Sequence, residues 1–152
     1  YPNLILLIVG EGNLSFKLKQ QVIRYNLEEQ VYFIGPKTPQ EIPSYMNAAD
    51  IFVLPSLSEG RPNVVGESMA AGTPTIATAV NGTSEFIEDG KDGFLIRPKE
   101  VGELTKALDT LLRNKELSNK FSINSRKSII RKKLNWDSCA KNYIKIYTKL
   151  IR

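Results

Sequence analysis

The chain has 152 residues, of which 41% are hydrophobic and 24% are charged, and its formal net charge is +5 at pH 7. This composition is typical of a globular protein that buries one core, so we predict a single domain over residues 1–152. With one cysteine and no histidine, the sequence nearly excludes a zinc site or a histidine-based catalytic triad, and we predict no metal.

Strands and helices are predicted to alternate along the first 96 residues. Short apolar runs bounded by Gly or Pro predict buried strands, and apolar residues three or four positions apart predict helices. The predicted strands are 4–10, 31–35, 51–56, 74–78 and 93–96, and the predicted helices are 15–26, 38–50, 62–72, 83–90, 100–114, 116–133 and 136–151. This order predicts an α/β fold, a Rossmann-like parallel sheet with helices on both faces, followed by a helical C-terminus.

Ligands bind at the carboxyl ends of the strands in sheets of this kind. The strongest candidate follows the third predicted strand, where residues 59–63 read EGRPN and lead into a helix. Pro62 suits the first helical position, because its missing N–H has no intrahelical partner there. Backbone amides of Gly60, Arg61 and Asn63 near the positive end of this helix would suit a phosphate.

Two glutamates flank this phosphate position. Glu67 lies one turn beyond Asn63 on the same helical face, ~6 Å further along the axis, and Glu59 precedes the helix. An ionised carboxylate only accepts hydrogen bonds and can hold both hydroxyls of a diol. Two such groups around a phosphate predict a nucleotide sugar. The spacing fits equally well with Glu67 as a solvent-facing residue and with Glu59 favouring the start of a helix.

Nearly the whole chain resembles the C-terminal half of a GT-B glycosyltransferase of the large retaining family four. The matching segments include YMNAADIFVLPSLSEG, GESMAAGTPTIAT and NGTSEFIEDGKDGFLIRP, and their most specific feature is a pair of glutamates separated by seven residues. The resemblance implies that Glu59, the candidate catalytic residue, contacts the donor sugar and that Glu67 contacts the ribose. The other implied donor-binding residues are Gly10, Gly12, Ser56, Gly60, Arg61, Asn63 and Val64.

The sequence departs from this family at two places. Many members have Glu-Gly-Phe-Gly where this chain has EGRP at 59–62, so Pro62 removes an amide donor. Arg61 adds a charge that either reaches the diphosphate or an anionic sugar, or is solvated. Members also open this domain with a strand and a loop that carries an Arg and a Lys, preceded by an acceptor-binding domain. This chain begins one unit later, at Tyr1, and we expect an inactive fragment of a longer protein.

The sequence therefore predicts the donor-binding domain of a retaining glycosyltransferase. The full-length enzyme would move a hexose from a nucleoside diphosphate sugar to a glycan or lipid-linked acceptor, without a cofactor. The alternatives are a non-catalytic nucleotide-sugar-binding module and a GT-B nucleotide-sugar epimerase. A nicotinamide enzyme is disfavoured, because Ser15 replaces the third glycine of the loop GEGNLS and no acidic residue ends the next strand. Gly10 and Gly12 also fit a simple tight turn.

Basic residues gather at the end of the sequence, where residues 113–152 hold 12 Lys and Arg against Glu116 and Asp137. Solvated helix faces account for this charge. The alternative is a peripheral contact of residues 126–133 with an anionic membrane, although we expect the two isoleucines of this segment to face the core.

We predict a cytoplasmic protein, with the inner face of the membrane as the alternative location. No apolar run approaches the ~18 residues of a membrane span, and the N-terminus lacks a signal-peptide pattern. Trp136, Tyr143 and Tyr147 are predicted to pack in the core. Since basic and aromatic residues do not alternate, we predict no nucleic-acid partner.

Overall fold

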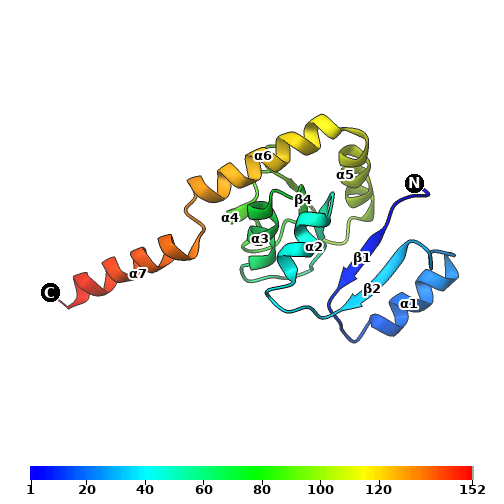
Figure 1. Ribbon diagram of the computed structural model, residues 1–152, viewed down its shortest axis with the longest axis horizontal. Helices are drawn as coiled ribbons and strands as arrows, with labels where there is room; N and C mark the ends of the chain where they lie inside the picture. The colour runs from blue at the N-terminus through cyan, green and yellow to red at the C-terminus, as the bar shows by residue number, and fades with distance from the viewer. Residues whose placement is uncertain (152) are drawn as a thin grey trace. The chain divides into compact units, whose positions relative to one another are not determined.

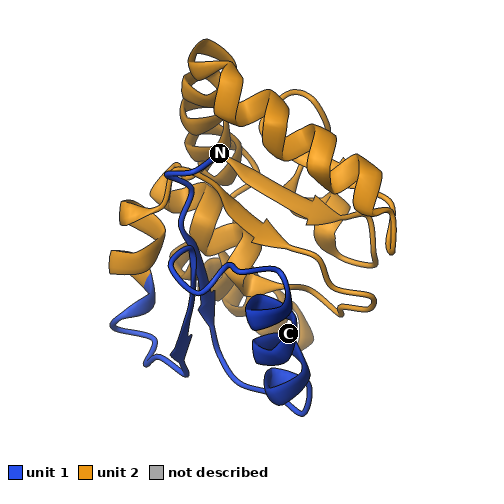
Figure 2. Cartoon of the chain, turned by 90° about the vertical axis from the view of Figure 1, so that its right-hand side faces the viewer, with its two compact units in different colours: residues 1–42 blue, residues 43–152 orange. Residues whose placement is uncertain are grey.

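The computed structural model describes residues 1–151, and the chain forms two compact units, Tyr1–Ile42 and Pro43–Arg152 (Figure 2). Each unit contains parallel strands with helices beside them, and the C-terminal part is helical (Figure 1). The predicted α/β class is therefore confirmed. The single domain expected over residues 1–152 stays a prediction, and the two units are described separately.

Unit 1 is a two-stranded parallel sheet with one helix: β1 (Leu6–Val9), α1 (Ser15–Arg24) and β2 (Val31–Gly35). Leu6 lies opposite Val31, and the register shifts after Ile8 so that Val9 lies opposite Gly35. The predicted burial of the first strand is not found, since Leu6 and Leu7 are about half exposed. Two strands and one helix have too few side chains to cover an apolar strand on both faces.

Unit 2 begins within α2 and contains three parallel strands in the order β3-β4-β5. The central strand β4 is buried along its whole length, because it has a neighbouring strand on each side and helices on both faces. The elements of this unit are α2 (Ile42–Ala48), β3 (Phe52–Leu54), α3 (Asn63–Ala71), β4 (Thr75–Thr78), α4 (Thr83–Phe86), β5 (Phe94–Ile96), α5 (Val101–Arg113), α6 (Lys115–Arg131) and α7 (Trp136–Leu150).

The core of unit 2 lies on both faces of β4. Ile76 and Ala77 are adjacent and fully buried, and they belong to different clusters because successive strand residues point to opposite faces. The first cluster is Val65, Met69, Ala77, Phe86, Ile87 and Ile129, and the second is Ile76, Ile96, Ala107, Leu111 and Phe121. Helices α3 and α4 supply the first face and α5 the second, so the prediction of helices on both faces is confirmed for this sheet.

Basic residues of α6 and of its C-terminal end bind the ends of two other helices. Arg126 donates hydrogen bonds to the carbonyl oxygen of Ala71, the last residue of α3. Lys132 donates to the carbonyl oxygens of Glu85 and Phe86, at 3.0 and 2.8 Å, in α4. A cation is favourable at the negative end of a helix. Part of the basic C-terminal charge therefore holds the fold together, a role that its sequence pattern does not indicate.

Two local predictions are wrong. Helix α2 begins at Ile42 rather than at 38, and the preceding residues form a turn in which the Glu41 carboxylate accepts hydrogen bonds from the amide and hydroxyl of Thr38. Helix α7 has no buried residue, and Trp136 is 84% exposed. Tyr143 and Tyr147 stack on each other, with their ring centroids 6.4 Å apart, instead of entering the core.

The isoleucines of the basic segment differ from each other. Ile129 is buried in the first cluster as expected, whereas Ile130 is 72% exposed. One residue along a helix turns the side chain by about 100°, and here that turn directs Ile130 to solvent. Within residues 1–151, no helix is both long enough and apolar enough to cross a membrane.

Candidate functional site

The candidate site lies at the carboxyl end of the unit 2 sheet, where the loops after β3 and β4 meet. The Thr78 hydroxyl, at the end of β4, donates a hydrogen bond of 2.5 Å to the carbonyl oxygen of Ser56. This bond fixes the start of the loop after β3 against the neighbouring strand. The loop then carries Glu59 and Gly60 toward the beginning of α3.

The two loops meet backbone to backbone at Gly60 and Gly82. A Cβ atom on Gly82 would lie 2.1 Å from the carbonyl oxygen of Gly60, and Gly82 has φ +79°. Both the contact and the conformation therefore require glycine. Thr83, the first residue of α4, buries its hydroxyl, which donates hydrogen bonds to the carbonyl oxygens of Thr78 and Val80. The N-cap of α4 is Gly82.

Helix α3 presents its positive end at this junction. Pro62 is the N-cap, with φ −72° and ψ 101°, and the helix begins at Asn63, so Pro62 lies one position earlier than predicted. Asn63 and Val64 are exposed, and the first amides of a helix have no partner within it. These two N–H groups are therefore available to an anion at the end of a nine-residue helix.

Glu67 lies on the solvent-facing side of α3. Its neighbours Val65, Ser68 and Met69 are fully buried, which orients the helix so that Asn63 and Glu67, one turn apart, are both exposed. Helix α3 also packs closely on α4, since a Cβ on Gly66 would lie 2.7 Å from the Phe86 ring. The orientation of Glu67 is therefore fixed by the core.

Glu59 is half-buried, and the Ser56 hydroxyl donates a hydrogen bond of 2.6 Å to its Oε1 atom. The bond orients the carboxylate, and Oε2 has no partner among the described residues. Ser56, predicted to bind the donor, thus contacts Glu59. The three-residue spacing gives no signal for this pairing, which depends on the bend of the loop.

Arg61 is engaged with α4 and is not simply solvated. Its Nε atom lies 2.9 Å from a carboxylate oxygen of Glu85, and its guanidinium lies over the Phe86 ring, 4.8 Å from the centroid. Glu85 thus neutralises part of the positive charge beside the helix end. The sequence did not point to Glu85, because this residue is 24 positions away.

Gly10 and Gly12 belong to unit 1, and both of their amides are occupied. The Gly10 N–H donates to the carbonyl oxygen of Gly35 at 2.8 Å, and the Gly12 N–H donates to the Ser15 hydroxyl at 3.2 Å. This geometry is that of a tight turn before α1. The structure brings together Ser56, Glu59, Gly60, Arg61, Asn63, Val64 and Glu67 at the loop after β3 and the start of α3.

The model of the family described as glycosyl transferases group 1 matches residues 1–128. The chain belongs to this family. Among relatives of this glycosyltransferase chain, an uncharacterised glycosyltransferase of Methanocaldococcus jannaschii is 32% identical, over 94% of this chain and 40% of the relative. The UDP-Gal:alpha-D-GlcNAc-diphosphoundecaprenol alpha-1,3-galactosyltransferase of Escherichia coli is 34% identical, over 85% of this chain and 33% of that enzyme.

Solved structures agree with this assignment. The crystal structure of Anabaena HepE in complex with UDP matches all of this glycosyltransferase chain and 42% of HepE, with a TM-score of 0.85 at 26% identity. A complex of the same protein with UDP-glucose matches with a TM-score of 0.84. The predicted likeness to the GT-B fold is therefore confirmed. The chain spans between a third and about two fifths of the length of these relatives.

Proposed function

We propose that this chain is the donor-binding part of a longer retaining glycosyltransferase. The full-length enzyme would transfer a hexose from a nucleoside diphosphate sugar to a glycan or lipid-linked acceptor. The observation that carries this proposal is the placement of two carboxylates, Glu59 and Glu67, around the exposed first amides of α3. An exposed carboxylate or a free amide at a helix start is common in proteins. Here Glu67, the amides and Glu59 together match the ribose, the diphosphate and the sugar of a nucleotide sugar.

The donor would lie across the start of α3. The diphosphate would accept hydrogen bonds from the amides of Asn63 and Val64 at the positive end of the helix. Glu67, one turn along, would bind the ribose hydroxyls, and Glu59, held by Ser56, would bind the hydroxyls of the sugar. A carboxylate that its own loop already orients loses little freedom when a ligand binds.

Catalysis would depend on position and on electrostatics. The departing diphosphate gains negative charge as the bond to the sugar breaks, and aligned amides stabilise that charge without reorganising. Pro62 supplies no N–H, so the donors begin at Asn63. Arg61 would act on the diphosphate or an anionic sugar only in competition with Glu85. This scheme requires no metal or cofactor, and we propose that the chain uses none.

The relatives support the choice of donor and acceptor classes. HepE binds UDP and UDP-glucose, and the Escherichia coli enzyme acts on a sugar linked to diphosphoundecaprenol. By analogy we propose a UDP-hexose or a similar donor and a cytoplasmic enzyme, with the inner face of the membrane as the place where a lipid-linked acceptor is met.

The proposal is tested with the full-length protein and a panel of nucleotide sugars. Calorimetry first measures the binding of each nucleotide sugar alone, and product formation is then measured after glycan or lipid-linked acceptors are added. Turnover with one donor and retained anomeric configuration supports the proposal. Binding without turnover, across all acceptors, would instead favour a non-catalytic nucleotide-sugar-binding module.

A further inference from the structure

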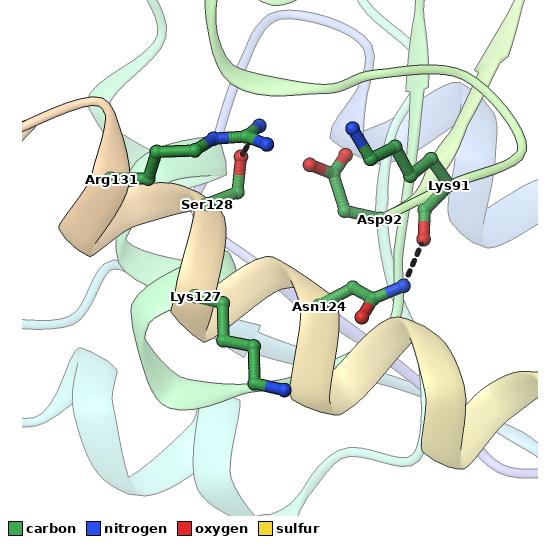
Figure 3. A pocket seen from close by; sticks show the side chains of 6 residues that line it. All are labelled: Lys91, Asp92, Asn124, Lys127, Ser128 and Arg131. Carbon is green, nitrogen blue, oxygen red and sulfur yellow. Dashed lines mark hydrogen bonds between the residues drawn. The ribbon is translucent and has the colours of Figure 1, made fainter.

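A pocket of about 130 Å³ lies between α6 and the loop that precedes β5 (Figure 3). Because β3, β4 and β5 are parallel, the starts and ends of these strands lie at opposite edges of the sheet. Glu59 follows the end of β3, whereas Asp92 precedes the start of β5. The pocket is therefore separate from the candidate donor site. Its lining residues are Lys91, Asp92, Asn124, Lys127, Ser128 and Arg131.

Asp92 places an unsatisfied acceptor in this pocket. The residue is 1% exposed, and its Oδ1 atom accepts a hydrogen bond of 2.7 Å from the amide of Glu88. Its Oδ2 atom is buried and has no partner among the described residues. Figure 3 shows the carboxylate directed toward Ser128 and Arg131 on α6. A buried carboxylate oxygen without a donor is unfavourable, so a hydrogen-bond donor in the pocket would stabilise this arrangement.

The surroundings of Asp92 carry an excess of positive charge. Lys91 and Arg131 both form ion pairs with Glu88, and Lys132 lies 3.8 Å from the same carboxylate. The hydrogen bond from Lys91, aided by the charges of Arg131 and Lys132, lowers the pKa of Glu88 below its ordinary value.

The remaining cation is Lys127, which is exposed and has no hydrogen-bond or ion-pair partner within residues 1–151. The pocket lining has three cations, Lys91, Lys127 and Arg131, and one carboxylate, Asp92, so it has a formal excess of two positive charges. Glu88 and Lys132, which lie 3.8 Å apart beside the lining, leave this excess unchanged.

We propose that this pocket binds a small phosphomonoester that carries a neighbouring hydroxyl group, such as a polyol phosphate. A phosphate ester carries about −1.5 to −2 charges at pH 7, which matches the positive excess. Lys127 and Arg131 would bind its oxygens, and its hydroxyl would donate to Oδ2 of Asp92. An anion that carries no hydrogen-bond donor would instead leave Oδ2 of Asp92 without a partner and would be repelled by its negative charge. The proposal does not depend on the proposed transferase activity.

The probe is sn-glycerol 3-phosphate, titrated into the full chain at pH 7 and followed by calorimetry and thermal unfolding. We expect binding and a concentration-dependent rise in Tm. Sulfate, which has the charge but no donor, and glycerol, which has hydroxyls but no charge, should each bind at least roughly tenfold more weakly, since each lacks one charge-assisted interaction. Absence of binding, or sulfate binding as tightly as the phosphoester, overturns the proposal.

Variants identify the residues. Lys127→Gln should weaken binding of the phosphoester roughly tenfold or more, and Lys120→Gln, an exposed lysine two turns earlier on the same face of α6, should leave it unchanged. Asp92→Asn keeps an oxygen for the Glu88 amide and replaces the other by a donor, so it should reduce the preference for glycerol 3-phosphate over sulfate.

Glu67→Ala, at the donor site, should have no effect on this binding. Equal losses in the Lys127 and Lys120 variants, or a loss in the Glu67 variant, would show that the phosphoester binds elsewhere.

Discussion

The two glutamates of the candidate site are predicted to have different roles that a pair of matched variants separates. Glu67→Ala should weaken binding of the free nucleoside diphosphate and of the nucleotide sugar equally, because both contain the ribose. Glu59→Ala should leave binding of the free diphosphate unchanged and weaken only the binding of the sugar-bearing donor. The measurement is calorimetry of the full-length protein with both ligands.

The magnitude follows from the contacts that each carboxylate can make. Glu67 is exposed and has no partner among the described residues, so its removal should not change the free energy of unfolding. One charge-assisted hydrogen bond contributes roughly 1.5–3 kcal/mol, which corresponds to a loss of about 10- to 150-fold in affinity.

Glu59→Ala should cause a loss of the same size in affinity for the sugar-bearing donor. In this variant the Ser56 hydroxyl, which donates to Glu59 in the unchanged protein, would donate to water instead. Ser56→Ala should therefore produce a smaller loss for the sugar-bearing donor only, since the carboxylate remains but is less well oriented.

Glu116→Ala is the matched control, because Glu116 is exposed in the first turn of α6. It should bind both ligands like the unchanged protein. If both site variants lose the same affinity for both ligands, the assignment of ribose to Glu67 and sugar to Glu59 is refuted. If neither variant loses affinity, the donor does not bind at the start of α3.

Four further predictions follow from the structure and the sequence. Gly82→Ala should reduce the free energy of unfolding by roughly 1–3 kcal/mol or more and lower Tm, because the added Cβ would meet the carbonyl oxygen of Gly60 in the facing loop. Gly102→Ala should raise Tm slightly, because a Cβ at Gly102 in α5 would have open space around it. In the folded protein the pKa of Glu88 is lowered below its ordinary value of 4.5, chiefly by the hydrogen bond from Lys91. The ionised carboxylate of Glu88 therefore stabilises the fold above that ordinary value, and this stabilisation is lost as the pH falls through the lower pKa of the folded protein. Urea unfolding between pH 3 and 7 should show the loss of stability, and Glu88→Gln should reduce the loss. The pure 152-residue chain should show no sugar transfer in a radiolabelled-donor assay, and measurable transfer would contradict the expected need for further domains. Solvated helix faces as the reason for the basic charge of residues 126–133 predict no salt-dependent sedimentation with anionic vesicles; binding that salt, Ile130→Ser and Lys133→Gln each reduce would instead support the membrane contact.

Local signals in the sequence predicted most elements of the fold. Residues 31–35 form β2 with the expected bounds, because the apolar run and its closing glycine both mark that strand. Gly72, the last residue of the helix predicted over 62–72, ends α3 in the left-handed conformation, at φ +77°. The position of Glu59 and Glu67 relative to the helix end was predictable for the same reason: a helix fixes which residues share a face and which end is positive.

Only the tertiary structure decided which partners these residues have. Arg61 pairs with Glu85, Arg126 with the end of α3, and Lys132 with α4, across 24 to 55 positions of sequence. Asp92 and Lys127 are brought to one pocket by the packing of α6 within unit 2.

Charge and periodicity mark such residues as polar and surface-directed, but they contain no information about which surface lies opposite. The sequence by itself therefore determined the order of the elements and which residues lie at the start of α3. The close approach of Gly60 and Gly82, the orientation of Glu59 by Ser56 and the unpartnered oxygen of Asp92 arise only when distant segments pack.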